Sequence, residues 1–545
     1  MGTTRDPSRA SRWSRWALAL VLGGALLGCG GSTSSPPAER PNFLFLVADD
    51  MSFEIGAYGD PLARTPNIDR LAAEGIRYTS AFSTAGVCAP SRAALWTGVF
   101  ATSIGAHHMR SIQGGYEPVP PPEIKTFTEY LRAAGYYTSS VGKMDYQFSG
   151  LGDAPITNWD QPNGDWRGRE PGQPFFAHVT ILDTHESQLF AERELTTDPG
   201  AVVVPPYEPD TPVVREDLAR HYDNVASLDG KVGRFLEMLE EDGVAENTVV
   251  FFFADNGRAL PREKRWVYDG GIHLPLVVRW PRSLVSGEVR DELVSWIDFA
   301  PTVLALAGVA VPSHLPGRVF VGSNSGPEPD YVFAAADRHD EARDRIRAVR
   351  DRRFKYVRNY QPETPYGQPI QFRDMLATMQ EIFRLHDEGL LQPPADWYYR
   401  QTKPVEELYD TRTDPYELDN LAGRPEHADR LAAMRAAHDA WVVDTNDLGV
   451  IPEPELAEMF WPGGVQPVTP PPSITPAGGD VDGAVRVEIR TDVDGASIAY
   501  TLEEGTGARW KLYAGPLEVT APATLRARAV RYGWAESSDT VAQFE

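Results

Sequence analysis

Between residues 42 and 254, short runs of consecutive apolar residues alternate with segments whose apolar positions recur at helical spacing. The apolar runs predict buried strands at 42–48, 136–141, 175–182 and 248–254. The helical spacing predicts helices at 68–76, 127–134 and 215–239. Strands without polar alternation that are separated by helices are typical of a parallel sheet covered on both faces. The pattern therefore predicts an α/β fold.

The pattern changes after residue 325. Residues 326–465 are more polar and contain a predicted helix at 426–442, which indicates a smaller α+β subdomain. Residues 466–476 are rich in proline and predict a linker. Short strands separated by turns follow at 477–545, as in a small β-sandwich. We expect residues 42–325 to form the main α/β domain.

The first 28 residues have the pattern of a secretion signal. A basic stretch precedes an apolar run at 16–27, which is shorter than the roughly 20 residues that a membrane-spanning helix needs. The run ends in Leu-Leu-Gly-Cys, which resembles the lipobox of bacterial lipoproteins. We expect a lipoprotein signal peptide at 1–28, a lipid on Cys29 and a flexible tether at 29–41. The body would then be extracytoplasmic and anchored to a bacterial membrane, in the periplasm or at the cell surface. An ordinary cleaved signal peptide is the alternative.

The chain carries 77 acidic and 52 basic residues among 545, a formal net charge of −25. So acidic a protein binds nucleic acid poorly, and an anionic substrate needs a local cluster of cations. Cys29 and Cys88 are the two cysteines of the chain, which excludes a disulfide framework.

Charged and polar side chains follow each of the four predicted strands: Asp49, Asp50, Lys143, His185, Asp255 and Asn256. Open parallel sheets bind ligands at the carboxyl ends of their strands, so we expect these side chains to surround one crevice. Three carboxylates and an amide oxygen suit Ca²⁺ or Mg²⁺. Helix capping after a strand is the alternative, since Asp and Asn favour that position.

Cys88 begins the segment Cys-Ala-Pro-Ser-Arg-Ala-Ala-Leu-Trp-Thr-Gly. The proline and the Ala-Ala-Leu predict a helix with Cys88 at its start, where free N–H groups and the helix dipole favour an anion. A thiolate would be stabilised there as well. From these residues alone, Cys88 is either a buried structural cysteine or a nucleophile beside Arg92.

The segment closely resembles the signature of the type I sulfatases, a family of the alkaline-phosphatase superfamily. The resemblance runs from residue 42 to about 421, and it includes the four strand ends and Lys264 ahead of YDGGIHLPLVV. It implies a sulfatase catalytic domain at 42–325, with a large mixed or parallel sheet flanked by helices, and a sulfatase C-terminal subdomain at 326–465.

The resemblance also implies that a maturation enzyme oxidises Cys88 to formylglycine. One hydroxyl of the hydrated aldehyde would attack sulfur, and deprotonating the other would expel sulfate and restore the aldehyde. Asp49, Asp50, Asp255 and Asn256 would hold Ca²⁺, in preference to Mg²⁺, with the modified Cys88 facing the ion. The ion and fixed cations would stabilise charge on the sulfuryl oxygens.

Four further roles follow from the resemblance. Arg92 and Lys143 would orient and activate the nucleophile. His185 and Lys264 would hold the sulfate, and either could protonate the leaving oxygen or nitrogen.

One position departs from the family pattern. Many relatives read Gly-Lys-x-His where this chain reads Gly-Lys-Met-Asp, so Asp145 replaces the histidine usually credited with deprotonating the diol. A carboxylate is a weaker base than imidazole. His107 and His108 are candidates to compensate or, like Asp145, to contact the substrate.

Phrases such as GKMDYQF and THESQ resemble a bacterial branch related to the heparan N-sulfatases. That resemblance favours a sulfated, glycosaminoglycan-like saccharide whose sulfate ester or sulfamate is hydrolysed. Arg262, Arg265 and Arg338 are candidates to bind a second anionic group, although each could equally be a salt-bridged arginine. The C-terminal segment resembles the fibronectin-III-like module of bacterial glycan-active enzymes, where it is either a spacer or a glycan binder.

Two other functions stay open. Formylglycine-dependent phosphonate or phosphate ester hydrolases share Cys-x-Pro-Ser-Arg and the metal crevice. A catalytically inactive, glycan-binding surface lipoprotein would instead keep Cys88 as a thiol.

Overall fold

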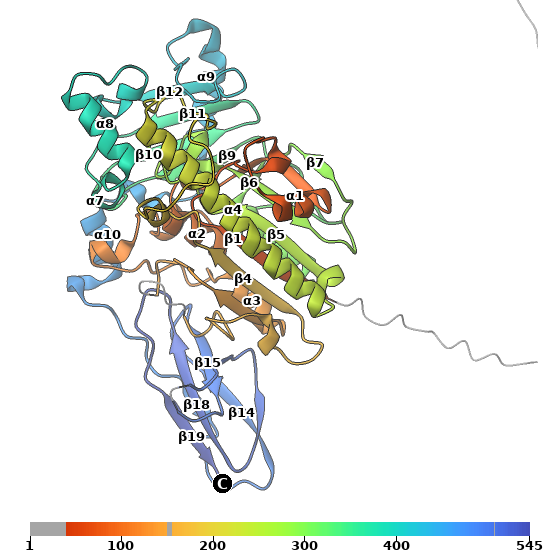
Figure 1. The fold of residues 1–545 in the computed structure, drawn as a ribbon. Coiled ribbons are helices and arrows are strands. Elements are labelled where there is room, and N and C mark those ends of the chain that lie inside the picture. The colour runs from red at the N-terminus through yellow and green to blue at the C-terminus, as the bar shows by residue number, and fades with distance from the viewer. Residues whose placement is uncertain (1–39, 150–154, 506) are drawn as a thin grey trace, which may run out of the picture. The chain divides into compact units, whose positions relative to one another are not determined.

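The computed structural model describes residues 40–149, 155–505 and 507–545 (Figure 1). The predicted signal peptide, Cys29 and most of the predicted tether lie outside the described residues. Within the described part of the chain, no helix is both long and apolar enough to cross a membrane.

The main sheet is mixed, and four of its neighbouring strands run parallel. In sheet order, its described strands are β3 (Tyr137–Val141), β4 (Phe175–Ile181), β1 (Asn42–Ala48), β5 (Thr248–Ala254), β6 (His273–Arg279), β2 (Ile76–Phe82) and β7 (Glu288–Arg290), with β8 (Val294–Ser295) also paired to β2. β6 runs antiparallel to both β5 and β2. The four parallel strands β3, β4, β1 and β5 are those that the apolar runs predict.

The apolar runs do not predict β2 or β6. β2 alternates between buried and half-buried positions, so it has no uninterrupted apolar run. Pro275 interrupts β6, and a proline within a run argues against a strand. Both strands form because tertiary packing outweighs these local signals.

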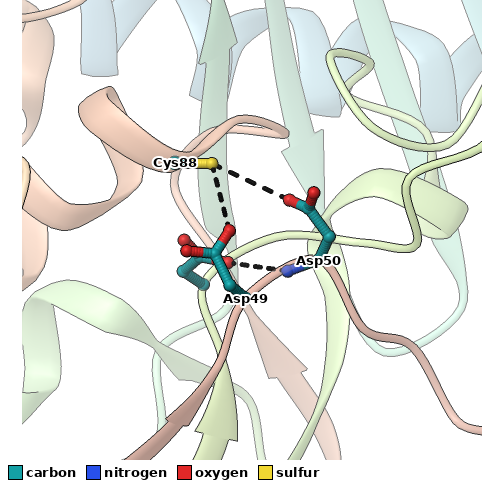
Figure 2. A group of neighbouring side chains, drawn as sticks. Asp49, Asp50 and Cys88 are labelled. Atoms are coloured by element: carbon teal, nitrogen blue, oxygen red, sulfur yellow. Dashed lines mark hydrogen bonds between the residues drawn. The ribbon is translucent and has the colours of Figure 1, made fainter. Parts of the chain in front are cut away.

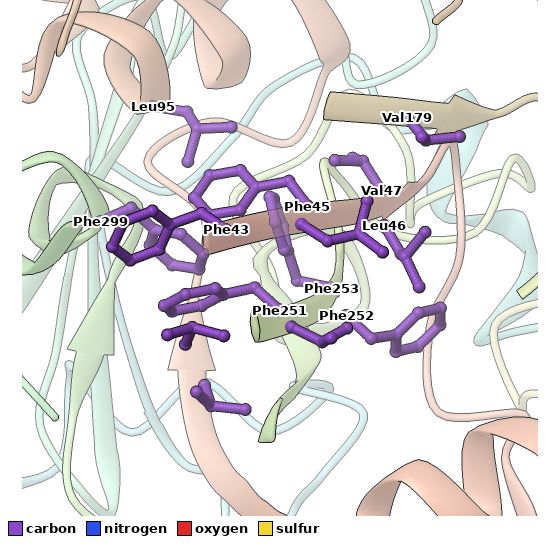
Figure 3. Close-up of a cluster of buried hydrophobic side chains, with 14 of the residues drawn as sticks. Phe43, Phe45, Leu46, Val47, Leu95, Val179, Phe251, Phe252, Phe253 and Phe299 are labelled. Atoms are coloured by element: carbon purple, nitrogen blue, oxygen red, sulfur yellow. The ribbon is translucent and has the colours of Figure 1, made fainter. Parts of the chain in front are cut away.

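Aromatic side chains fill the core of this sheet (Figure 3). Every residue of β1 and β5 is buried, so both faces of the sheet are covered. The ring of Phe45 packs against Phe176, Phe251 and Phe299, with centroids 4.9, 5.0 and 5.7 Å apart. Truncating such a phenylalanine to alanine typically costs about 3–5 kcal/mol. The core is thus a close-packed support for the loops at the strand ends.

Two groups of helices cover the sheet (Figure 1). The helices α1 (Pro66–Ala73) and α4 (Pro212–Glu241) contact each other, and α2 (Cys88–Thr97), α3 (Phe127–Ala133) and α6 (Phe299–Leu306) contact one another. The short α5 (Asp269–Ile272) leads into β6. Thr211 caps α4 by accepting a hydrogen bond from the Val214 N–H, and Pro212 begins the helix.

The predicted α+β subdomain is built on a second, antiparallel sheet. Its strands, in sheet order, are β12 (Glu406–Asp410), β11 (Phe354–Asn359), β10 (Ile346–Arg350) and β9 (Val332–Ala336). Its helices are α7 (Gln371–Asp374), α8 (Ala377–Asp387), α9 (Ala428–Asp444) and α10 (Glu453–Phe460).

Two antiparallel sheets form the C-terminal β-sandwich. One contains β13 (Ser473–Thr475), β14 (Ala484–Arg490) and β17 (Leu517–Thr520); the other contains β16 (Lys511–Leu512), β15 (Ser497–Thr501), β18 (Ala523–Val530) and β19 (Thr540–Phe544). Apolar side chains from both sheets make a separate small core. Because β13 lies within the predicted linker, the sandwich begins earlier than the predicted residue 477.

Candidate active site

Asp49 and Asp50 at the end of β1 lie beside Asp255 and Asn256 at the end of β5. Ala48 and Ala254 are register partners, so Asp49 and Asp50 on one strand neighbour Asp255 on the next. The backbone N–H of Asp50 donates to Oδ1 of Asp255 at 3.2 Å. Asp50 also has a left-handed backbone, with φ of 60°, a strained conformation that is common at functional sites.

Cys88 is the first residue of α2 and points at this acidic pair (Figure 2). Its Sγ lies 3.6 Å from Oδ1 of Asp49 and 3.7 Å from Oδ1 of Asp50. One potential ligand atom from each of Asp49, Asp50, Cys88 and Asp255 lies within 4.8 Å of the others, and all four residues are buried. The structure therefore brings together residues from three separate segments of the chain, as the sequence predicts.

The chemistry of this cluster fits a metal ion. Its three buried carboxylates offer hard oxygen donors, although Arg92, Lys143 and Lys264 already balance their formal charge. Oδ1 of Asn256 is buried and has no hydrogen-bond partner among the described residues, while its Nδ2 donates to Oδ1 of Asp50 at 2.8 Å. A set of oxygen donors that includes an unpaired amide oxygen suits a hard divalent cation. The acidic cluster can accordingly hold a metal ion.

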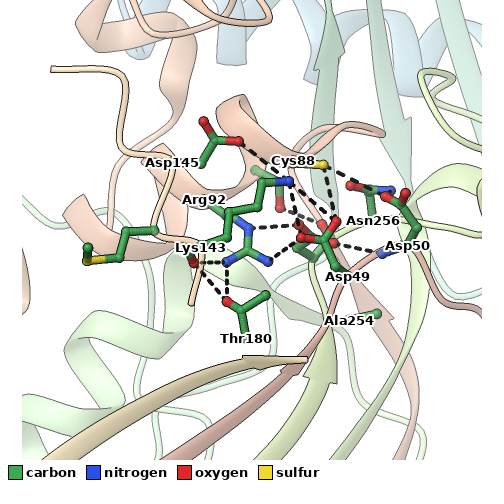
Figure 4. Close-up of polar contacts among 12 residues, drawn as sticks. Asp49, Asp50, Cys88, Arg92, Lys143, Asp145, Thr180, Ala254 and Asn256 are labelled. Atoms are coloured by element: carbon green, nitrogen blue, oxygen red, sulfur yellow. Dashed lines mark hydrogen bonds and ion pairs between the residues drawn. The ribbon is translucent and has the colours of Figure 1, made fainter. Parts of the chain in front are cut away.

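Arg92 is fully buried beneath the cluster and pairs with two of its carboxylates (Figure 4). Its Nε lies 2.8 Å from Oδ2 of Asp255, and its Nη2 lies 3.2 Å from Oδ2 of Asp49. The same guanidinium donates to the Lys143 carbonyl and to the Thr180 hydroxyl, both at 2.8 Å. Arg92 thus holds the acidic cluster and the Lys143 backbone in fixed positions.

Two lysines approach the cluster from other loops. Nζ of Lys143 lies 3.1 Å from Oδ2 of Asp49. Nζ of Lys264 lies 2.5 Å from Oδ2 of Asp50 and 3.4 Å from Oε2 of Glu186. Both ammonium groups are therefore beside the Cys88 side chain, where an anion bound at that position would meet positive charge.

The protonation of the cluster reflects competition between burial and charge. Burial raises the pKa of Asp49, but the charges of Lys143 and Arg92 outweigh it and hold the pKa well below its ordinary value. Burial and the charge of Asp49 raise the pKa of Asp255 to about 6. Burial also raises the pKa of the Cys88 thiol well above its ordinary value. The expectation of a stabilised thiolate is thus wrong for the unmodified residue, because desolvation and nearby carboxylates outweigh the helix dipole and the lysines.

A cavity of about 540 Å³ opens onto the Cys88 side chain. His185 and Lys264 line it together with Cys88. Burial lowers the pKa of His185, which favours its neutral imidazole, and Nδ1 of that ring lies 2.9 Å from the Ser187 hydroxyl. The nucleophile and both predicted sulfate contacts therefore share one solvent-accessible space.

Asp145 lies beside Lys143 rather than deep in the acidic cluster. Its carboxylate is 3.6 Å from Nζ of Lys143 and 3.8 Å from Nε of Arg110. Oδ2 of Asp145 is buried and makes no hydrogen bond with any described residue, and the residue has a left-handed backbone with φ of 56°. The carboxylate that replaces the family's histidine thus lies next to the cluster and can accept a further hydrogen bond.

Asp145 and three other predicted substrate contacts do not line the cavity. His107 and His108 are buried behind its wall, and burial lowers the pKa of each to about 3. Arg262 donates to the backbone carbonyls of Tyr416 and Glu417 at 2.7 Å and stacks on the Tyr268 ring. These three side chains serve packing and loop structure, which spacing in the sequence does not distinguish from ligand contact.

Arg265 and Arg338 do line the cavity, although each already has a carboxylate partner. Arg265 pairs with both carboxylate oxygens of Glu186 at 2.9 Å, and Arg338 pairs with Glu453 at 2.7 Å. Burial raises the pKa of Glu186, but Arg265 and Lys264 outweigh it and lower the pKa to about 2, so these pairs are fully charged at neutral pH.

Sequence reasoning missed other residues of the cavity wall: Arg110, Glu186, Arg343, Phe372 and Met375. Glu186 directly follows His185, so its position next to a predicted site residue was a usable signal. The last three come from the polar subdomain, where no motif marks them. Only the packing of that subdomain onto the main domain brings them to Cys88.

Comparisons with known proteins agree with this geometry. The family model described as Sulfatase matches residues 41–162 and 164–309, and that of the N-sulphoglucosamine sulphohydrolase C-terminal region matches residues 262–368. Residues 476–542 match the chitobiase/beta-hexosaminidase C-terminal domain, a more specific relationship for the sandwich than the predicted resemblance to fibronectin III.

Two curated relatives cover most of the chain. An ulvan-active sulfatase of Formosa agariphila is 40% identical over 92% of this chain and 90% of its own length. Human N-sulphoglucosamine sulphohydrolase is 28% identical over 78% of this chain and 94% of its own length. The solved structure of a 2-O glycosaminoglycan sulfatase shares the fold, with a TM-score of 0.55 at 20% identity, covering 75% of this chain and 93% of that one. The sulfatase signature at Cys88, the assembled acidic cluster and these matches show together that the chain belongs to the sulfatase family.

Proposed function

We propose that this sulfatase hydrolyses sulfate esters or sulfamates on an acidic glycan of the glycosaminoglycan or ulvan kind. The observation that carries the proposal is the position of Cys88, whose side chain lies between the acidic cluster and the cavity, beside Lys264 and His185. The names of the two curated relatives, which refer to ulvan and to N-sulphoglucosamine, support the choice of substrate class.

Cys88 is proposed to carry formylglycine, made by a maturation enzyme, since its raised thiol pKa makes the unmodified side chain a poor nucleophile. Asp49, Asp50, Asp255 and Asn256 would hold Ca²⁺. When bound, the ion would supply positive charge to the sulfuryl oxygens and favour the ionised nucleophile. Once Cys88 is converted to formylglycine, the potential ligands of the cluster are all oxygen atoms, which is the reason to prefer Ca²⁺ over softer metals.

The side chains around residue 88 would each have a separate role in the reaction. Lys143 would keep a positive charge next to residue 88, and Arg92 would keep Asp49 and Asp255 in place. Lys264 would donate hydrogen bonds to the sulfate. His185 would hold the sulfate as a neutral imidazole or, once protonated, pass a proton to the leaving atom. Asp145 would accept the proton when sulfate is released, because its Oδ2 makes no hydrogen bond with a described residue, although it lies 3.6 Å from Nζ of Lys143.

We further propose that the protein is secreted and lipid-anchored through Cys29 to a bacterial membrane. The apolar run before Leu-Leu-Gly-Cys supports this location. An acidic polysaccharide of the kinds named above is too large to cross a membrane unaided, which agrees with an extracytoplasmic enzyme.

Two measurements test the catalytic proposal. The mass of the tryptic peptide Tyr78–Arg92 from the native host should correspond to the aldehyde or its hydrate, and a thiol throughout would contradict the proposed nucleophile. The matured protein should release sulfate from heparin-derived or ulvan-derived saccharides. Turnover of an aryl phosphonate ester in preference to every sulfated probe would instead favour a phosphonate hydrolase.

A further inference from the structure

The cavity at Cys88 is larger than a sulfate group requires. At about 540 Å³ it falls in the range of roughly 300–1,000 Å³ that is common for pockets that enclose whole small molecules. Cys88, His185 and Lys264 account for its inner end, whereas Arg343, Phe372 and Met375 of the α+β subdomain line it as well. The wall contributed by the subdomain must therefore face another part of the substrate.

This wall carries Arg343, whose positive charge acts on Glu453 but pairs with no described carboxylate at ion-pair distance. The Arg343 side chain is exposed, and its guanidinium makes no hydrogen bond or ion pair with any described residue. Its backbone is nonetheless fixed, because the Gln368 side chain accepts from the Arg343 N–H and donates to its carbonyl. An arginine on an anchored backbone with an unpartnered guanidinium is well suited to bind an external carboxylate or sulfate.

Arg110 is the second cation of this kind. Its side chain is about a third exposed, and its ion pair with Asp145 is long, at 3.8 Å. It also has a left-handed backbone, with φ of 54°, and such strain is commonly kept where a side chain must be aimed. Arg265 and Arg338 differ from Arg110 and Arg343, since short bonds to carboxylates already occupy them.

The same wall exposes apolar surface next to the proposed sulfate site. Phe372 and Met375 are 40% and 57% exposed, and both line the cavity. The Phe372 ring packs on Phe190 at 5.1 Å and lies 6.3 Å from the His185 ring, so its exposed part borders the reacting end of the cavity. An aromatic ring beside charged donors suits a sugar, which has one apolar face and a polar rim.

We propose that this wall is a subsite for an acidic sugar residue joined to the sulfated one. Arg343, assisted by Arg110, binds the carboxylate of that residue, and Phe372 with Met375 contacts the face of its ring. This inference rests on the proposed function and deepens it, because it makes a uronate-containing oligosaccharide, rather than a sulfated monosaccharide, the preferred substrate.

Other charges border this subsite. Asp340 lies 3.6 Å from Arg265, so a cation already compensates it. Glu341 is exposed and also lines the cavity. Its negative charge opposes an anionic ligand, so Glu341→Gln should tighten the binding of an acidic sugar.

Calorimetric binding to the full chain carrying Cys88→Ala, which cannot be matured and does not turn over, tests the subsite directly. The probes are a sulfated uronate-containing disaccharide from heparin and one from ulvan, each intact and with its carboxyl group reduced to an alcohol. We expect carboxyl reduction to raise the Kd at least tenfold for the disaccharide that binds. Arg343→Gln should raise the Kd of the intact probe to the same extent and leave that of the reduced probe unchanged.

Matched variants separate this effect from general charge or folding. Arg486→Gln removes an exposed arginine of β14 outside the cavity and should change no Kd. Phe372→Ala should weaken both the intact and the reduced probe. The subsite is overturned if no probe binds, or if carboxyl reduction leaves every Kd unchanged.

Failure of the subsite and failure of the proposed function give different results. If the matured enzyme releases sulfate but the Kd does not change on carboxyl reduction, the subsite proposal is wrong and the proposed function stands. If binding depends on the carboxyl group but the matured enzyme releases no sulfate, the proposed function is wrong and the subsite proposal stands.

Discussion

The Tyr532 ring of the C-terminal sandwich stacks on Phe148 of the main domain, with ring centroids 4.7 Å apart and planes 16° apart. The Tyr532 hydroxyl lies 2.7 Å from Oε1 of Glu129 and 2.8 Å from Oδ1 of Asn158. The Gly533 N–H donates to the Phe148 carbonyl at 3.1 Å. Phe148 follows closely on Lys143 and Asp145 in the chain, so the sandwich supports the segment that carries two site residues.

Tyr532→Phe should therefore destabilise the whole protein. It leaves the buried Glu129 and Asn158 oxygens with one partner fewer, at a cost of about 1–3 kcal/mol. Urea unfolding of the full chain measures this loss. Tyr513→Phe is the control, because the Tyr513 hydroxyl accepts only from Ile489 within the sandwich, among the described contacts. An equal effect of both variants would show that the contacts between the sandwich and the main domain add no stability.

Removing the metal should lower the unfolding temperature. Without the metal, the buried carboxylates of Asp49, Asp50 and Asp255 keep Arg92, Lys143 and Lys264 as partners but lose the free energy of metal binding. A ligand present at 100 times its Kd stabilises the folded state by about 2.7 kcal/mol. Calorimetric scans with a chelator, and then with excess Ca²⁺, should show a reversible upward shift. Asp49→Asn should abolish that shift, and an unchanged unfolding temperature in wild type would contradict the metal site.

Lowering the pH should destabilise the folded protein, because Glu54 becomes protonated. Burial raises the pKa of Glu54, but Arg258 at 3.1 Å outweighs it, so the pKa falls to about 2. A depressed carboxyl pKa stabilises the folded state above the ordinary value near 4.5, and that stability is lost as the pH falls toward 2. The shift corresponds to roughly 3 kcal/mol. In Glu54→Gln, the free energy of unfolding should depend less on pH between 5 and 2.5, whereas exposed Glu426→Gln should behave like wild type.

Lys264→Met should lower kcat/KM for a sulfated saccharide by about 10²–10³, the usual cost of losing one donor that stabilises transition-state charge. It also leaves Asp50 without its 2.5 Å partner, so metal binding needs to be measured in parallel. Lys231→Met removes an exposed lysine that pairs with Asp183 and serves as the control. If Lys264→Met keeps the wild-type kcat/KM, Lys264 does not contribute to catalysis.

Asp145→Asn should slow the reaction by about 10²–10⁴, the range for loss of a general base. Asp145→His should restore activity, because it reinstates the side chain that many relatives have there. Its rate should fall as the pH drops through the imidazole pKa near 6.5, unlike that of wild type. If Asp145→Asn keeps the wild-type kcat, another group accepts the proton.

The sequence by itself predicted the parts of the fold that local pattern encodes. The uninterrupted apolar runs of β1 and β5 predict buried strands, since only a strand covered on both faces can hide every side chain. The polar residues after them predict the crevice, because parallel strands end at one edge. Cys88 could be placed at a helix start because capping and helix-forming preferences act over a few residues.

Tertiary structure alone decided which charged side chains face the substrate. Arg262 and Arg343 look alike in the sequence, yet Arg262 is buried against Tyr268 and backbone carbonyls while Arg343 is exposed on the cavity wall. His107 and His108 likewise follow a promising pattern but lie behind that wall. Whether a cation meets a partner or solvent depends on contacts between segments far apart in the chain. No local spacing records those contacts, whereas strand and helix preferences depend largely on residues that are close in the sequence.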